Sequence, residues 1–327
     1  MAWTCWVPTI SFAHHVEYLR ADVGSDPTRR SISSNVSSTG SSPAWQRNLN
    51  SGSYFATPKG CHSLRQDVGV IDAEFEEARE WIAEAQRITV FTGAGISTDS
   101  GIPDFRGPNG LWTRNPAAEK ASTLQNYLAD PDVRRFAWQN RLHSPAWEAV
   151  PNSGHLAIYE LERQGRLRAV VTQNIDELHQ RAGHLPANVI EVHGTMRWSR
   201  CWSCYDRRPM QETLERVRAG EDDPHCLVCR DGILKSDTVS FGQSLVPEVI
   251  DAAMRAADEC DLLLAAGSTL SVFPAANVVP RAKASGARVV IVNGEPTAMD
   301  RFADALLIGS LGEILPELIR RPVRKGP

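Results

Sequence analysis

One pattern constrains the fold of this 327-residue chain more than any other: a short apolar run that ends in glycine or polar residues, repeated five times. The runs lie at Ile88–Phe91, Leu167–Val171, Asn188–Val192, Leu262–Ala266 and Arg288–Val292. Short, continuous apolar runs of this kind are typical of strands buried on both faces of a parallel sheet. A helical stretch from about Pro274 to Ala284 joins the last two runs. The pattern therefore predicts an α/β fold in which helices cover both faces of a parallel sheet.

Two stretches interrupt this pattern and predict a smaller second lobe. Residues 107–150 have helical character, whereas residues 196–237 carry four of the seven cysteines. The Rossmann-like lobe is then assigned to residues 67–106, 151–195 and 238–327. In such sheets ligands bind beyond the carboxyl ends of the strands. The polar residues that follow the five runs are therefore expected to converge on one site.

Residues 1–66 differ in composition from the rest of the chain. The stretch from Ser31 to Ser42 consists mostly of Ser, Thr, Gly and Asn. A segment with so few residues to bury cannot offset the entropy lost on ordering, so we expect a disordered tail. Two other interpretations stay open, a wrongly assigned start site and a Ser-rich mitochondrial targeting segment.

The charge balance and the hydrophobic runs exclude several kinds of partner. Lys and Arg number 35 and Asp and Glu 39, which gives a formal net charge of −4. This balance argues against a strongly basic nucleic-acid-binding protein and against a polybasic membrane-binding segment. No run reaches the ~18 consecutive apolar residues of a membrane-spanning helix. We expect an intracellular, cytoplasmic protein with no membrane partner and no direct nucleic-acid binding.

Four of the cysteines form two C-x-x-C pairs, Cys201 with Cys204 and Cys226 with Cys229. In a long intracellular chain this grouping favours a metal over disulfides. Four thiolates complete a tetrahedral zinc site and leave no position for water, so we expect one structural zinc ion. A zinc ribbon that binds nucleic acid is the alternative, although the acidic residues 221–223 offset the nearby arginines.

The turn Gly93-Ala94-Gly95 follows the first run and could bring the backbone close to a phosphate. A lone G-x-G is weak support for such a site, because many turns between a strand and a helix carry glycine for packing alone. The dinucleotide-binding fingerprint also requires a third glycine, and Thr98 occupies that position. The turn therefore makes a hydride-transferring dehydrogenase less plausible.

Longer motifs are far more specific than this turn. They are Gly93-Ala94-Gly95-Ile96-Ser97, Ser100-Gly101-Ile102-Pro103-Asp104-Phe105-Arg106-Gly107, Gly110-Leu111-Trp112, Thr172-Gln173-Asn174-Ile175-Asp176, Leu178-His179 and Glu191-Val192-His193-Gly194. With these motifs in this order and the four spaced cysteines, the chain resembles the sirtuin family of NAD-dependent protein deacylases from about Ile88 to Leu318. The resemblance implies a sirtuin-type catalytic domain over residues 67–327.

The resemblance also implies where NAD and the substrate bind. NAD would lie across the carboxyl ends of the strands, and the residues assigned to it are Gly93, Ala94, Gly95, Ser97, Asp104, Phe105, Arg106, Trp112, Gln173, Asn174, Ile175, Asp176, Gly267, Ser268, Thr269, Asn293, Gly294, Glu295 and Leu311. An acyl-lysine peptide would lie as an added strand between two loops. Phe241 and Gly242 stand in one of these loops and Val272 in the other.

His193 and Asn174 are the candidate catalytic residues. An imidazole suits proton transfer at neutral pH, and in the family His193 would deprotonate a ribose hydroxyl, which then attacks the acyl carbon. The implied reaction consumes NAD as a co-substrate and yields nicotinamide, O-acyl-ADP-ribose and free lysine. We expect the acyl group to be acetyl. Protein mono-ADP-ribosylation and a non-catalytic NAD-sensing module stay open as alternatives.

The acyl chain itself is harder to assign. Deacylases for acidic acyl groups carry a Tyr-x-x-Arg pair, and the nearest candidate here is Trp138-Gln139-Asn140-Arg141, which lacks the tyrosine. Arg141 could pair with a carboxylate, but we expect it to lie on a helix surface instead.

Overall fold

The computed structural model describes residues 64–105, 110–114 and 116–320. Helix α1 (Leu64–Glu84) begins within the predicted tail, which includes its first three residues. Residues 1–63 of that tail lie outside the described residues. Within the described residues, no helix combines the length and apolar character needed to span a membrane.

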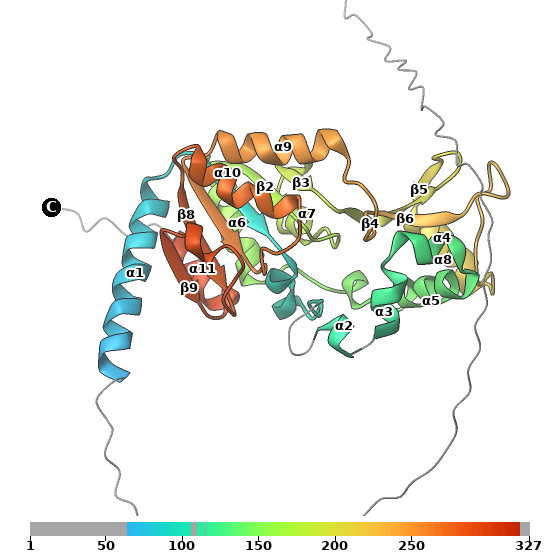
Figure 1. The fold of residues 1–327 in the computed structure, drawn as a ribbon, viewed down its shortest axis with the longest axis horizontal. Helices are drawn as coiled ribbons and strands as arrows, with labels where there is room; N and C mark the ends of the chain where they lie inside the picture. Colours follow the sequence, from blue (N-terminus) through green and yellow to red (C-terminus); the bar gives the residue numbers. More distant parts are fainter. Residues whose placement is uncertain (1–63, 106–109, 115, 321–327) are drawn as a thin grey trace, which may run out of the picture. The chain divides into compact units, whose positions relative to one another are not determined.

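The main element is a parallel sheet of six strands in the order β3-β2-β1-β7-β8-β9. The strands are β1 (Ile88–Thr92), β2 (Leu167–Thr172), β3 (Val189–Glu191), β7 (Leu262–Ala266), β8 (Arg288–Asn293) and β9 (Ala305–Ile308). The five predicted strands are confirmed, and β9 is an edge strand that the sequence analysis did not predict. From β1 the chain adds strands first on one side and then on the other (Figure 1). The carboxyl ends of β1 and β7 therefore mark the topological switch where ligands bind in such sheets.

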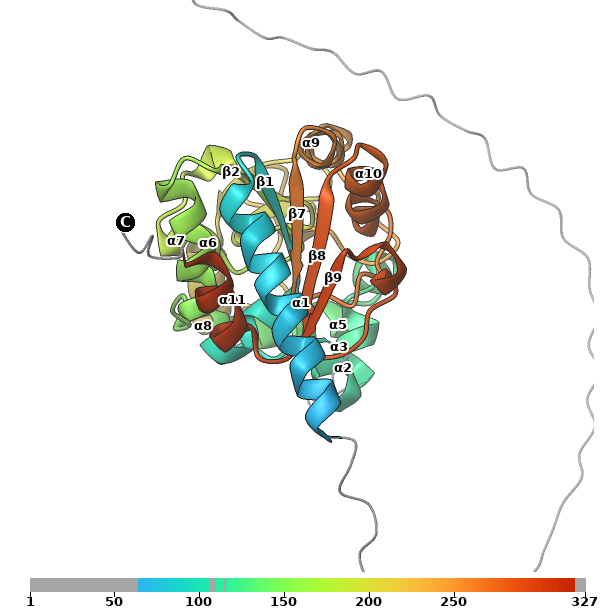
Figure 2. The same ribbon diagram turned by 90° about the vertical axis from the view of Figure 1, so that its left-hand side faces the viewer.

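Helices cover both faces of this sheet, as predicted (Figure 2). One face packs against α1, α6 (Ser153–Arg163) and α11 (Leu311–Ile319), with Ile82, Ile158 and Leu315 buried in the contact. The other face packs against α9 (Pro247–Asp258) and α10 (Val278–Ala284) through alanines and valines. Burial on both faces explains why β1 and β7 are apolar or small along their whole length, since every side chain of these strands is buried.

A smaller lobe is built from the two interrupting stretches. Its helices are α2 (Leu111–Arg114), α3 (Pro116–Ala121), α4 (Leu124–Ala129), α5 (Pro131–Leu142) and α8 (Met210–Arg218). An antiparallel sheet in the order β5-β4-β6 carries the cysteines, with β5 (Arg207–Pro209), β4 (Gly194–Cys201) and β6 (Leu234–Thr238). Trp138, Met210 and Leu214 form its core against Cys201 and Cys226. A helical insertion and a cysteine-bearing module are thus both present.

Candidate functional site

A cavity of about 1620 Å³ lies at the carboxyl ends of the strands and extends toward the smaller lobe. Nearly all the residues singled out from the sequence line it: Gly93, Ala94, Gly95, Ser97, Asp104, Phe105, Gln173, Asn174, Ile175, Asp176, His193, Phe241, Gly242, Gly267, Ser268, Thr269, Val272, Asn293, Gly294, Glu295 and Leu311. Arg106 and the side chain of Trp112 lie outside the described residues. The fold therefore gathers residues from seven separate segments around one space.

The glycines after β1 and β7 let two loops pack against each other at the floor of the cavity. A Cβ on Gly93 or on Gly95 would lie 2.8 Å from backbone atoms of Gly267, and Gly267 itself has φ +67°. The N–H of Gly95 donates to the carbonyl of Gly267 at 2.8 Å. Loop packing by itself thus explains these glycines. Because they carry no side chain, they also let the backbone at the cavity floor come close to a ligand.

The amide of Asn174 and the carboxylate of Asp176 lie in one hydrogen-bond network with Ser97. Asn174 Nδ2 donates to the carbonyl of Gly93 at 3.1 Å and to Ser97 Oγ at 3.0 Å. Ser97 in turn donates to Asp176 at 2.8 Å, and the N–H of Leu178 donates to the other carboxylate oxygen at 2.9 Å. Burial raises the pKa of Asp176, although these bonds oppose the shift. The network fixes the loop after β2 onto the turn after β1.

His193 follows β3 and faces the same cavity. Its Nδ1 lies 3.1 Å from the carbonyl of Gln173. Since a carbonyl oxygen only accepts, Nδ1 carries the proton and Nε2 keeps its lone pair. Burial lowers the pKa of His193, and the bond to Gln173 offsets only part of that shift. At neutral pH the side chain is therefore a neutral imidazole with one nitrogen ready to accept a proton.

Gln173 connects His193 to the loop after β7. Its side chain Nε2 donates to Ser268 Oγ at 2.8 Å, while its backbone N–H donates to Thr92 at the end of β1. The residue therefore holds three strand ends in register. Gln173 does not cap the helix that follows, because Glu177 stands at the N-cap of α7 (Leu178–Ala182).

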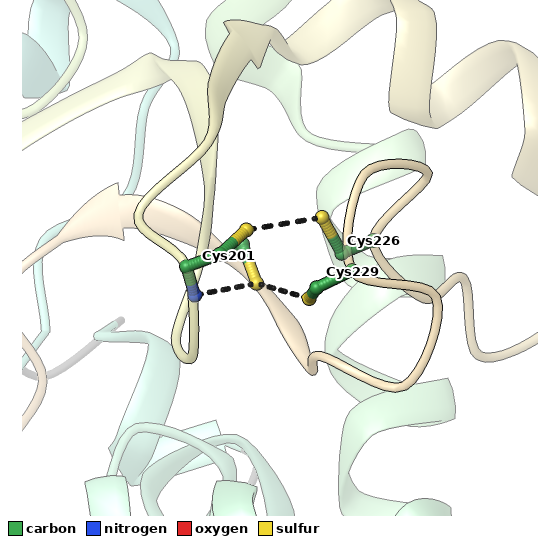
Figure 3. Close-up of side chains that lie close together, drawn as sticks. Cys201, Cys226 and Cys229 are labelled. Carbon is green, nitrogen blue, oxygen red and sulfur yellow. Dashed lines mark hydrogen bonds between the residues drawn. The ribbon is translucent and has the colours of Figure 1, made fainter.

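The four cysteine sulfurs gather at one point of the smaller lobe. Cys201 ends β4 and faces Cys226 and Cys229, which lie in another loop (Figure 3). Cys204 lies in the turn that follows Cys201. The sulfurs lie within 4.8 Å of one another, and the pairs Cys201–Cys229 and Cys204–Cys226 are each 3.6 Å apart. A tetrahedral zinc ion with Zn–S bonds of about 2.3 Å requires S···S separations of about 3.8 Å. The donor set and its spacing fit one structural zinc ion.

The surroundings of the cysteines support this fit. Backbone N–H groups of Ser203, Cys204 and Val228 point at sulfur atoms at 3.3–3.4 Å, which stabilises thiolates. A Cβ on Gly232 would come within 2.4 Å of Cys201 Sγ. Only glycine leaves room for the sulfur cluster at that position.

The expectation for Arg141 was wrong. Arg141 lines the cavity instead of lying on an outer helix surface. Tyr127 and Lys235 line the same cavity, and Lys235 is only 5 % exposed. Burial, followed by the charge of Arg141, lowers the pKa of Lys235 to about 7. Trp138, the other end of the motif, is buried in the core of the smaller lobe.

Three residues that support the site were not recognised as such from the sequence. Thr92 and Thr172 end neighbouring strands, and Thr92 Oγ1 donates to Thr172 Oγ1 at 2.8 Å. His179 Nε2 lies 3.0 Å from Thr92 Oγ1. Thr172 and His179 stand in motifs quoted above, but those motifs gave no indication that His179 has a partner 87 residues away.

Comparison with known proteins agrees with this geometry. The sequence model described as Sir2 family matches residues 93–274. The NAD-dependent protein deacetylase 2 of Streptomyces coelicolor is 48% identical over 233 residues, which cover 71% of this chain and 96% of that protein. The NAD-dependent protein deacylase 2 of Archaeoglobus fulgidus is 40% identical, over 78% of this chain and 98% of that protein.

Solved structures give the same result. A Sir2 enzyme structure concerned with mechanism and regulation aligns with a TM-score of 0.69 and 39% identity, covering 76% of this chain and 97% of the other. A Sir2 structure with a p53 peptide and NAD+ aligns with a TM-score of 0.67 and 31% identity, covering 75% and 97%. With the matching fold, cavity residues and cysteine cluster, these similarities show that the chain belongs to the Sir2, or sirtuin, family.

Proposed function

We propose that the protein removes acyl groups, chiefly acetyl, from lysines of other proteins and consumes NAD in doing so. The observation that carries this proposal is the placement of a neutral imidazole, His193, in the same cavity as Asn174 and the glycine loops. A protein that only senses NAD has no need of a positioned base. The relatives named above as deacetylase and deacylase support the same reaction.

Some residues of the cavity bind NAD, and His193 transfers a proton. When bound, NAD supplies nicotinamide as a leaving group and a ribose that takes the acyl group. Gly93, Gly95 and Gly267 leave backbone exposed to the diphosphate, and Gln173 lies beside His193 where a ribose hydroxyl would bind. His193 Nε2 then accepts the hydroxyl proton as the oxygen attacks the acyl carbon.

The acyl-lysine peptide is proposed to add as a strand between the loops that carry Gly242 and Val272. The backbone of Phe241 is already bonded, because its N–H donates to Ser122 and its carbonyl accepts from Leu124. Among the described residues, none bonds to the backbone N–H of Gly242 or Val272, so both can pair with a peptide. Sir2 structures solved with a p53 peptide support the binding of a peptide substrate. Main-chain pairing of this kind tolerates many sequences.

The test measures both products of the reaction. We expect the full-length protein, given NAD and an acetyl-lysine peptide, to release nicotinamide and O-acetyl-ADP-ribose in equal amounts, measured by mass spectrometry. Nicotinamide release with ADP-ribose on protein would support a transferase instead, and NAD binding without either product would support a sensor.

A succinyl-lysine peptide belongs in the same experiment. Arg141 brings a guanidinium into the cavity, and Lys235, whose pKa is lowered to about 7, brings an amine that is partly protonated at neutral pH. These two groups favour an acidic acyl group as the second candidate substrate. If the protein removes succinyl groups faster than acetyl groups, succinyl-lysine and not acetyl-lysine is its main substrate.

The electrostatics of His193 predict how the activity depends on pH. Because burial lowers the pKa of this base below its ordinary value of about 6.5, it stays deprotonated at pH 7. We expect kcat/KM for the acetyl peptide to be level down to about pH 6.5 and to fall only below it, as protonation removes the base. Rates measured from pH 5 to 8 check this, and a fall centred above pH 7 would contradict it.

The cytoplasm is the proposed location. A zinc site of four thiolates suits a reducing compartment, and the net charge of −4 offers no basic surface for membranes or nucleic acids. A mitochondrial location through residues 1–66 is the alternative, and cell fractionation of the full-length protein distinguishes the two.

A further inference from the structure

Three histidines form a buried cluster behind the cavity. His155 lies in the first turn of α6, His179 in α7 and His184 just after α7, and each is at most 2 % exposed. The ring centroids of His155 and His179 are 5.0 Å apart, and those of His179 and His184 are 5.7 Å apart. Burial lowers the pKa of all three, to about 4 for His155. The cluster therefore consists of neutral imidazoles at pH 7.

In two of the rings, a hydrogen-bond partner determines which nitrogen carries the proton. His155 Nδ1 accepts from the backbone N–H of Asn152 at 3.4 Å, so its proton lies on Nε2. His184 Nδ1 faces the carboxylate of Glu162, which can only accept when ionised. His184 therefore carries its proton on Nδ1, and its Nε2 has a lone pair.

In the third ring, that of His179, the two threonines at the strand ends determine which nitrogen carries the proton. Because Thr92 uses its hydroxyl proton to donate to Thr172, its oxygen must accept from His179 Nε2. His179 therefore carries its proton on Nε2, and its Nδ1 has a lone pair. The N–H of Asn174 donates to the same Thr172 oxygen at 3.1 Å. This ring thus connects the histidine cluster to a residue of the NAD site.

The remaining three nitrogens are His155 Nε2, His179 Nδ1 and His184 Nε2, and none has a partner among the described residues. They comprise one donor and two acceptors, which matches a water molecule that accepts one hydrogen bond and donates two. Buried waters typically make about three such bonds to groups that otherwise lack partners. A metal ion does not fit, because the protonated Nε2 of His155 has no lone pair to offer.

We propose that His155, His179 and His184 enclose one ordered water molecule, and that this network positions Thr172 and Asn174 at the NAD site. One end of the network is fixed by Glu162, which also accepts from the N–H of Leu185 and from Asn188 Nδ2. The other end is the hydrogen bond from Asn174. His179 is the positioning residue between the two ends, and it lies behind the cavity without lining it.

The water and the proton positions can be tested on the free full-length protein. A crystal structure is expected to show one water within about 2.7–3.2 Å of the three nitrogens. Nitrogen-15 NMR at pH 7 is expected to place the proton on Nε2 of His155 and His179 and on Nδ1 of His184. Absence of that water from well-defined density, or a different proton position in any of the three rings, would overturn the proposal.

Glu162→Gln gives a sharper version of the NMR test. The amide oxygen is needed by Leu185 and Asn188, so the amide NH₂ must face His184 Nδ1. We expect the His184 proton to move to Nε2, while His193, on the far side of the site, keeps its Nδ1 proton as an internal control. A His184 proton that stays on Nδ1 would overturn the count of donors and acceptors on which the water depends.

The positioning role rests on the proposed function and has its own test. In glutamine, Nε2 can replace the imidazole Nε2 that donates to Thr92, whereas leucine offers no donor. We expect His179→Leu to raise the Kd for NAD about 3–10-fold, the range for one neutral hydrogen bond, and His179→Gln to remain near wild type. Equal weakening by both variants, or none by leucine, would overturn this role.

Calorimetry without peptide measures that Kd, so failure of the deacylase assay would not be mistaken for failure of this test. The KM for the acetyl peptide adds a second readout. Because the network ends at Asn174, we expect His179→Leu to change the KM for NAD and to leave the peptide KM unchanged. A parallel rise in both constants would indicate general disruption of the fold and would also overturn the positioning role.

Discussion

Replacing His193 with alanine is expected to lower the rate of O-acetyl-ADP-ribose formation by about 10²–10⁴-fold, the usual contribution of a positioned general base. The reason is local, since His193 offers an unprotonated Nε2 toward the cavity while its Nδ1–H is held by Gln173. Steady-state rates with NAD and acetyl peptide, followed by mass spectrometry, measure the effect.

Two controls separate loss of the base from loss of structure. The Kd of the variant for NAD and its midpoint of thermal unfolding are both expected to stay close to the wild-type values, because His193 makes one hydrogen bond to a backbone carbonyl. A variant that keeps more than a tenth of the wild-type rate would exclude His193 as the general base.

Removal of the zinc ligand Cys201 is expected to unfold the smaller lobe. Structural zinc contributes on the order of 10 kcal/mol to the folding of small zinc-binding peptides, and Cys201 is fully buried in the core that contains Trp138 and Met210. We expect Cys201→Ser to lose its zinc, to lower the midpoint of thermal unfolding and to lose activity together with folding. Metal analysis, calorimetric unfolding and activity are measured on the same sample.

Cys260→Ser is the matched control for this substitution. Cys260 is also buried, but it lies beyond α9 and outside the four-cysteine cluster. This variant is expected to retain one zinc per chain and full activity, with only the small destabilisation of a buried thiol replaced by a hydroxyl. A folded, zinc-free and inactive Cys201→Ser protein would contradict a purely structural role for the metal.

Local patterns in the sequence were sufficient for much of the architecture. The strands β1, β2, β7 and β8 were predictable because burial on both faces requires largely apolar runs, and each run ends in glycine or polar residues. The edge strand β3 is only half-buried, but its short run ends in the same way. The cysteine pairs predicted the zinc site because two C-x-x-C turns suffice to bring four thiolates together. β9 was missed because four residues are too few for periodicity to distinguish a strand from a helix.

Only the tertiary structure determined which distant residues meet. The sequence by itself determined five of the six strands and the zinc ligands, since those depend on local runs and spacing, whereas the residues around His193 were assigned through the resemblance of their motifs to the sirtuin family. It could not show that Arg141 turns toward Lys235, that Gly95 packs on Gly267, or that His179 bonds to Thr92. Such contacts depend on how helices and loops pack across the fold, and the spacing of residues along the chain carries no record of that packing.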